Sequence, residues 1–197
     1  MKNSRVCIAV SSVVLLAVAV AYAADQPTSA PTAPAPAPEM AKLKAYEGKW
    51  MCTGQINASP FGPAHKSSTK VTAHLDLGGF WLSGRVAESK TAENPMPMEG
   101  MFHETWDPGA KQFLMLWVDN SGGWAQETSA GWDGDTMVWT GDGFGGGQKM
   151  GERDSFTMKG PGEFAHTMAI NVGGQWTPLG EETCRHASAP AAAAPKK

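Results

Sequence analysis

The sequence lacks the patterns that usually mark an enzyme or a nucleic-acid-binding protein. Only 18% of its 197 residues are charged, and 16 Lys and Arg stand against 19 Asp and Glu. The basic residues are scattered, whereas a nucleic-acid-binding surface needs a basic patch or stripe, so no nucleic-acid partner is expected. No Ser-His-Asp, H-E-x-x-H or phosphate-loop pattern occurs. We therefore predict no catalytic residues and favour a non-enzymatic protein.

Long hydrophobic runs are also scarce. The longest apolar run extends over residues 6–20, which is short for a membrane span. It follows Lys2 and Arg5 and precedes the small-residue sequence A-Y-A at 21–23. This order is typical of a secretory signal peptide. We predict a signal peptide at residues 1–23 and a periplasmic or secreted protein without a membrane span after cleavage. A retained membrane anchor is the alternative.

Two segments lack any apolar period. Residues 24–39 and residues 188–197 are rich in proline and alanine and almost free of charge, apart from a basic end. Such segments cannot bury enough apolar surface to fold, so we predict a disordered linker and a disordered tail. The folded part is then residues 40–187, which is the size of one domain with a substantial core.

Helical patterns are nearly absent. Residues 39–46 are the one helix candidate, because Met40, Leu43 and Tyr46 recur at helical spacing after Pro38. Two turns are not stable alone. We therefore predict a short N-terminal helix that plugs one end of a larger core.

Strand patterns fill the remainder of the chain. Short runs of aromatic and β-branched residues are interrupted by glycine-rich turns about every ten residues, which predicts an antiparallel meander. Closing about ten strands into an up-and-down barrel removes the exposed sheet edges, and a β-sandwich is the alternative. The glycine-rich residues 143–147 are predicted to form a longer, flexible loop. The predicted strands are 49–56, 68–77, 80–88, 98–106, 112–119, 123–131, 136–142, 152–159, 163–172 and 175–186.

One predicted strand is apolar on both faces. Residues 113–118 read Phe-Leu-Met-Leu-Trp-Val, without the polar alternation of the other strands. A strand of this kind is usually buried on both sides. We predict that its outer face is covered by the N-terminal helix, a loop or a partner.

Several short motifs follow one another in a characteristic order. They are 43–50 (LKAYEGKW), 77–82 (LGGFWL), 98–100 (MEG), 105–108 (TWDP), 117–122 (WVDNSG), Arg153 and 184–185 (CR). In their order and spacing the chain resembles the bacterial domain-of-unknown-function family 1579, whose members have a calycin-like, lipocalin-type barrel and no established reaction. The resemblance implies an antiparallel calycin-like barrel at residues 40–187. Family members commonly carry Tyr where Trp106 stands, so a hydroxyl is lost from any polar site there.

The first and last strands meet at the seam of such a barrel. In lipocalin-type barrels the Trp of an opening G-x-W motif lies near an Arg of the last strand, and the resemblance carries these roles to Trp50 and Arg185. Cys52 and Cys184, on the same two strands, are expected to form a disulfide in an oxidising compartment. Arg185 faces away from Cys184, however, so without a bulge only one of the two contacts can form. Two buried thiols are the alternative to the bridge, and without a C-x-x-C motif a redox-active pair is not expected.

Two other groups of residues point to metal or haem binding. Met96, Met98, Met101 and His103 supply the soft ligands that suit Cu(I), but they fall on opposite faces of one strand. A plain core strand is the alternative. His166 lies in an otherwise apolar inward row, where it would ligate haem, orient the polar end of a ligand, or serve as a hydrogen-bonded core histidine. We predict no bound metal or cofactor.

The sequence leaves three functions open. The first is a non-enzymatic barrel that binds a small apolar or amphipathic molecule in its lumen. The second is a structural or interaction domain with a filled lumen, and the third is an enzyme that uses His166 or Arg153. The sequence does not indicate an oligomeric state. The predicted ligand-binding residues are Phe80, Leu82, Phe102, Trp106, Trp117, Trp139, His166 and Met168.

Overall fold

The computed structural model describes residues 33–187. The predicted signal peptide (1–23) and tail (188–197) lie outside the described residues, and the predicted linker (24–39) is described only from residue 33. Among the described residues, no helix has both the length and the apolar character needed to span a membrane.

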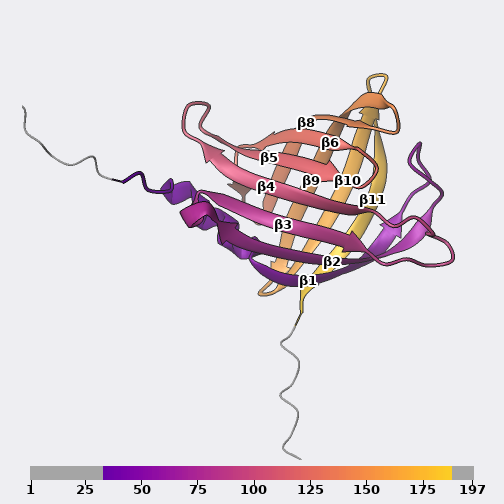
Figure 1. Ribbon diagram of the computed structural model, residues 1–197, viewed down its shortest axis with the longest axis horizontal. Helices are drawn as coiled ribbons and strands as arrows, with labels where there is room; N and C mark the ends of the chain where they lie inside the picture. Colours follow the sequence, from indigo (N-terminus) through magenta and orange to yellow (C-terminus); the bar gives the residue numbers. More distant parts are fainter. Residues whose placement is uncertain (1–32, 188–197) are drawn as a thin grey trace, which may run out of the picture. The chain divides into compact units, whose positions relative to one another are not determined.

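One 3₁₀ helix is followed by a long series of antiparallel strands, as the glycine-rich turns predict (Figure 1). The ten predicted strands are all present. An additional two-residue strand, β7, is too short to give a sequence signal. The elements are η1 (Pro38–Tyr46), β1 (Gly48–Ile56), β2 (His65–Asp76), η2 (Leu77–Gly79), β3 (Trp81–Glu88), β4 (Glu99–Asp107), β5 (Gln112–Asp119), β6 (Trp124–Ser129), β7 (Trp132–Asp133), β8 (Thr136–Gly145), β9 (Gln148–Gly160), β10 (Glu163–Val172) and β11 (Gln175–His186).

The strands form a closed barrel. All consecutive strands pair except β6 and β7, and β1 also pairs with β11 and β6 with β8. The β6–β8 pairing leaves β7 at the margin, bound to β8 alone, and joins the other ten strands into a ring. Closure removes the unpaired sheet edges that would otherwise attract another chain. The barrel prediction is therefore confirmed, and the β-sandwich alternative is wrong.

The predicted loop at 143–147 is wrong. β8 continues to Gly145 and β9 begins at Gln148, so only Gly146 and Gly147 form the turn. Both have positive φ values of 56° and 82°, which glycine adopts without strain. The glycines of residues 143–147 therefore belong to two paired strands and to the two-residue turn that connects them, and not to a flexible loop.

The helix η1 packs against the barrel. Its apolar residues Met40, Leu43 and Tyr46 are buried in the core, as their spacing predicts, and it contacts β2, β3 and β4. The ring of Tyr46 stacks on Trp132, whose Nε1 donates a hydrogen bond to the Lys42 carbonyl at 3.2 Å.

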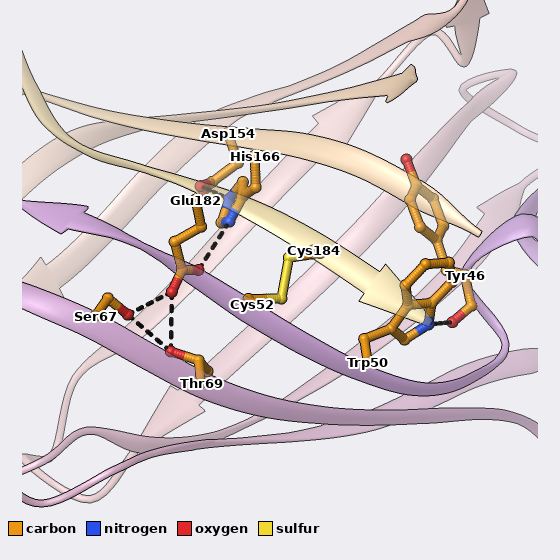
Figure 2. Close-up of a disulfide and its surroundings, with 9 residues drawn as sticks. All are labelled: Tyr46, Trp50, Cys52, Ser67, Thr69, Asp154, His166, Glu182 and Cys184. Carbon is orange, nitrogen blue, oxygen red and sulfur yellow. Dashed lines mark hydrogen bonds and ion pairs between the residues drawn. A yellow bond between two sulfur atoms is a disulfide. The ribbon is translucent and has the colours of Figure 1, made fainter. Parts of the chain in front are cut away.

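The register between β1 and β11 determines which of the two contacts predicted at the seam is formed. Cys52 lies directly opposite Cys184, and the two form a disulfide (Figure 2). Trp50 lies opposite His186 and packs edge-on against its ring. Arg185 is mostly exposed, and its Nε donates to Glu163 Oε2 at 2.9 Å. The Trp50–Arg185 contact does not form, because alternation turns Arg185 outward when Cys184 points inward.

The outer face of β5 is not covered within residues 33–187. Its outward side chains Leu116 and Val118 are 37% and 50% exposed. Val118 belongs to an apolar row across four strands, because Met101 pairs with Val118, Val118 with Trp124, and Trp124 with Phe144. We call these four residues the outer row. Within the described residues, neither η1 nor a loop covers this face, and its covering by a partner stays a prediction.

Candidate functional site in the barrel lumen

The lumen nearest η1 is filled by aromatic side chains. Trp50, Phe113, Trp139 and Phe164 are all at most 5% exposed, and their rings pack edge-on with each other or with neighbouring rings. Leu82 is fully buried among them. We call this part the aromatic half, and it leaves little room for a ligand.

Glycines line the other end of the lumen. A Cβ atom built on Gly84 would lie 2.0 Å from the Phe102 ring, and one built on Gly100 would lie 2.2 Å from the Trp117 ring. Each large ring therefore lies against a glycine of the neighbouring strand, in the space that a side chain there would fill. Both rings remain half-buried. We call this part the glycine half.

A layer of polar side chains separates the two halves. Its members come from β6, β9, β10 and β11, and strand alternation turns each of them inward. We call this layer the polar belt: Glu127, Glu152, Asp154, His166 and Glu182.

His166 is held between two carboxylates in this belt (Figure 2). Its Nε2 lies 2.8 Å from Asp154 Oδ1, and its Nδ1 lies 3.8 Å from Glu182 Oε2. The ring also stacks on Phe156, with 4.3 Å between centroids. Burial lowers the pKa of His166, but the hydrogen bonds and charges of the two carboxylates outweigh it and raise that pKa to about 9. The side chain is therefore a partly buried imidazolium at neutral pH.

Glu182 is satisfied on its other side as well. Its Oε1 accepts hydrogen bonds from the Ser67 hydroxyl and, at 2.9 Å, from the Thr69 hydroxyl. Burial raises the pKa of Glu182, but His166 and these hydroxyls act in the opposite direction and lower it below its usual value. This side of the belt is a fully paired network that is expected to be rigid.

The β6 side of the belt is different. Glu127 is 1% exposed, and neither of its carboxylate oxygens has a hydrogen-bond partner among the described residues. Burial, and then the charges of Asp154 and Glu152, raise the pKa of Glu127 to about 9. Burial and the Asp154 charge likewise raise the pKa of Glu152 to about 7. Three carboxylates with few donors therefore share one part of the lumen.

The predicted ligand-binding residues are divided between the two halves. Leu82 and Trp139 are fully buried in the core, and Phe102 and Trp106 pack against it while half-buried. Phe80 is half-buried at the end of η2, just before β3 begins. The three that remain half-buried on inward positions of β5 and β10 are Trp117, His166 and Met168.

The positions of Met96, His103, His166 and Arg153 do not favour the copper, haem and catalytic roles considered from the sequence. Met96 is 87% exposed, and His103 Nδ1 is hydrogen-bonded to the Ser83 hydroxyl at 2.9 Å. Both ring nitrogens of His166 face carboxylates, so iron ligation would have to break this pairing. Arg153 alternates outward from Glu152 and stacks over the Trp176 ring at 4.0 Å.

The belt carboxylates are not among the site residues predicted from sequence. Acidic residues are usually solvated, so no single carboxylate stood out. The available signal was alternation: Ala125, Glu127 and Ser129 share a face, and Glu152 and Asp154 precede the inward Phe156. Extending these apolar rows would have placed the carboxylates inside.

A closed antiparallel meander with a short N-terminal helix packed on it belongs to the class of calycin-like barrels. Within this class, the chain belongs to the family described as "Protein of unknown function (DUF1579)", whose model matches residues 35–185. The family membership predicted from the sequence resemblance is therefore confirmed.

Two solved structures are similar to this chain. Rv2717c from M. tuberculosis has 14% sequence identity and a TM-score of 0.60, over 77% of this chain and 99% of that chain, which supports the fold alone. A protein of unknown function from the DUF3598 family of Nostoc punctiforme matches with 10% identity and a TM-score of 0.23, over 76% of this chain and 99% of that chain, which is too low to support an argument. No curated protein matches the chain.

Proposed function

We propose that this chain is a binding protein of the cell envelope that takes a small amphipathic molecule into its glycine half. The observation that carries this proposal is that the rings of Phe102 and Trp117 lie against Gly84 and Gly100 and remain half-buried. Pockets for small molecules are commonly lined by such apolar walls with a few polar groups at one side. In this proposal η1 closes the opposite end, where the aromatic half is already filled.

The polar belt defines the chemistry of the ligand's polar end. It carries four carboxyl groups and one imidazolium. Even with Glu127 protonated at neutral pH, the remaining acidic side chains outnumber the imidazolium, so the field at this side of the glycine half is negative. A ligand with a carboxylate at its polar end would be repelled, whereas an amine or a hydroxyl group would find acceptors. The proposed ligand class is therefore a neutral or cationic amphipathic molecule, and simple fatty acids are disfavoured.

The disulfide supports the proposed location. Disulfides persist in oxidising compartments and are rare in the cytosol. The Cys52–Cys184 bridge, together with the signal-peptide pattern at residues 1–23, favours export.

Tryptophan fluorescence tests the proposal directly. The purified chain is titrated, with EDTA present, with a ten-carbon alkyl amine, the matching alcohol and the matching carboxylate. We expect saturable changes in the order amine, alcohol, carboxylate. Val86→Trp, which fills the glycine half, should abolish binding, and Ala87→Trp, on the opposite face of the same strand, should not. Absence of saturable binding by all three ligands would contradict the proposal.

A second function, an interaction domain, is favoured by the outer row. Its four apolar residues are 38–50% exposed on adjacent strands, and a hollow of about 490 Å³ over β6 and β8 adjoins Trp124. Exposed apolar patches often mark protein interaction sites. If this face pairs with a second copy of the chain, sedimentation should show a concentration-dependent dimer that Trp124→Glu disrupts. A monomer at all concentrations would oppose this function.

A further inference from the structure

Three carboxylates of the polar belt lie close together in the lumen, and one of them, Glu127, has no hydrogen-bond partner among the described residues. We infer that Glu127, Glu152 and Asp154 form a binding site for one hard divalent cation, of the Ca²⁺, Mg²⁺ or Mn²⁺ class. This inference does not depend on the amphipathic ligand proposed above, because the ion would occupy the belt with or without it.

The geometry fits an ion held by three oxygens. One carboxylate oxygen from each of the three residues lies within 4.8 Å of the other two. Oxygens on opposite sides of a bound Mg²⁺ or Ca²⁺ are about 4 to 5 Å apart, since the metal–oxygen distances are about 2.0 to 2.6 Å. The three carboxylates therefore lie within reach of one shared ion.

The strand register builds this arrangement. Glu127 on β6 pairs with Gly141 on β8, and Gly141 pairs with Glu152 on β9, so a glycine stands between the two glutamates. The next inward residue of β8 is Gly143, where a Cβ atom would lie 1.9 Å from Glu152 Oε1. The two glycines keep β8 from filling the space that the carboxylates share.

The state of Glu127 is the second, independent observation. It is 1% exposed, and both of its oxygens are without a donor among residues 33–187. A buried polar group without a partner is costly and rare in native proteins, and it calls for a compensating proton or cation. In this part of the chain, no lysine or arginine forms an ion pair with any of the three residues. A divalent cation supplies the missing compensation.

The ligand set selects the class of ion. Carboxylate oxygens without thiol or thioether ligands suit hard ions such as Ca²⁺, Mg²⁺ and Mn²⁺, and suit Cu(I) poorly. His166 binds Asp154 Oδ1 and leaves Oδ2 for the ion. It is a positioning residue for this site, because hydrogen bonds to a ligating carboxylate fix its orientation. Glu152 and Asp154 are less buried than Glu127, so water or a ligand oxygen can complete the coordination from the glycine half.

Calorimetry and thermal unfolding test the site. The full purified chain is treated with EDTA, desalted and titrated with CaCl₂, MgCl₂ and MnCl₂. We expect one ion per chain and an increase in Tm that saturates with the ion. Tb³⁺ serves as an optical probe, because Trp139 lies opposite Asp154 on the neighbouring strand and should sensitise its luminescence.

Two matched variants test whether the cation binds at Glu127. Glu127→Gln should weaken Ca²⁺ binding at least tenfold, which is about 1.4 kcal/mol, and should remove most of the Tb³⁺ luminescence. Glu104→Gln removes another buried lumen carboxylate outside the cluster and should leave both signals unchanged. If Glu127→Gln does not fold, as judged by circular dichroism in EDTA, Glu152→Gln takes its place.

The outcomes separate this inference from the proposed function. No heat and no Tm change with millimolar Ca²⁺, Mg²⁺ and Mn²⁺, or equal Ca²⁺ affinity in Glu127→Gln and the parent chain, would overturn the cation site. The alkyl-ligand titrations are made in EDTA, so their success or failure bears on the glycine half alone.

Discussion

The aromatic half and the glycine half are built from the same strands but have opposite composition. β9 carries Phe156 and Met158 in the aromatic half, and Glu152 and Asp154 in the belt. β10 changes from Phe164 to His166 between adjacent inward positions. Alternation along each strand is the same throughout. The same alternation therefore builds an apolar core at one end of the barrel and a polar belt beyond it.

The two halves also differ in energetics. In the aromatic half, large rings are buried away from water. Burial of one such side chain contributes about 1.5–3 kcal/mol to the free energy of unfolding. The belt and Glu104 instead bury carboxyl groups, and Glu104 Oε2 and both Glu127 oxygens lack partners within the described residues. Groups of this kind reduce stability. We therefore expect stabilising residues to concentrate at one end of the barrel and destabilising ones at its middle.

The largest effect is expected from the disulfide, which joins the two ends of the meander beside the aromatic half. The bridge links residues 132 positions apart, and the chain-entropy model assigns about 5 kcal/mol to a loop of this length. The double variant Cys52→Ser/Cys184→Ser should lose most of this amount in urea unfolding. Reduction of the parent chain with dithiothreitol should have a similar effect. A loss below about 1 kcal/mol would show that the seam is held by its strand pairing and packing alone.

The next largest effect is expected from removing one aromatic ring in each half and comparing the losses in free energy of unfolding. Phe113 is fully buried in the aromatic half, so Phe113→Ala should cost about 4 kcal/mol in free energy of unfolding. Trp117, on the same strand, is half-buried in the glycine half, so Trp117→Ala should cost about half as much despite its larger ring. Denaturant unfolding measures both. Equal losses would mean that the glycine half is packed as tightly as the aromatic half.

This division explains how much could be predicted from sequence. The strands, the closed barrel and the buried Met40, Leu43 and Tyr46 follow from local periodicity and turn residues. The belt does not, because it depends on register between distant strands. Nothing local indicates that Glu127 meets Glu152 across Gly141.

The seam shows the same limit. The family resemblance predicted a contact between Trp50 and Arg185. The position of the two cysteines on the first and last strands predicted a disulfide between Cys52 and Cys184. Alternation on β11 showed that the two conflict but did not show which would form. The register that places Cys52 opposite Cys184 decides this, and it is a property of the whole barrel.

A smaller effect of opposite sign is expected at Glu104. Burial raises its pKa from 4.5 to about 8, so the folded chain holds this proton at pH values where the unfolded chain has released it. Below pH 4.5 both states are protonated and the group has no effect. As the pH rises from 4.5 to 8, the unfolded state is increasingly favoured, and above pH 8 the full penalty is present.

Glu104→Gln removes this penalty. The variant should be more stable than the parent chain by about 2 kcal/mol at pH 8.5, and the difference should shrink towards zero near pH 4.5. Urea unfolding across this pH range measures the change. Glu99→Gln, on the same strand and 56% exposed, is the control and should show no such dependence. A difference that grows as the pH falls would contradict the raised pKa.

The smallest effect is expected at Arg185, where the seam departs from the lipocalin pattern. If Arg185 closed the barrel floor against Trp50, Arg185→Ala would remove a buried partner and cost several kcal/mol. In this structure its side chain is 62% exposed and pairs with Glu163, and exposed ion pairs contribute at most about 1 kcal/mol. Arg185→Ala should therefore change the free energy of unfolding by less than that amount, and Glu163→Ala should match it. His186→Ala removes the ring that packs on Trp50. It should lower the free energy of unfolding more than Arg185→Ala or Glu163→Ala, because His186 is the residue of β11 that contacts Trp50.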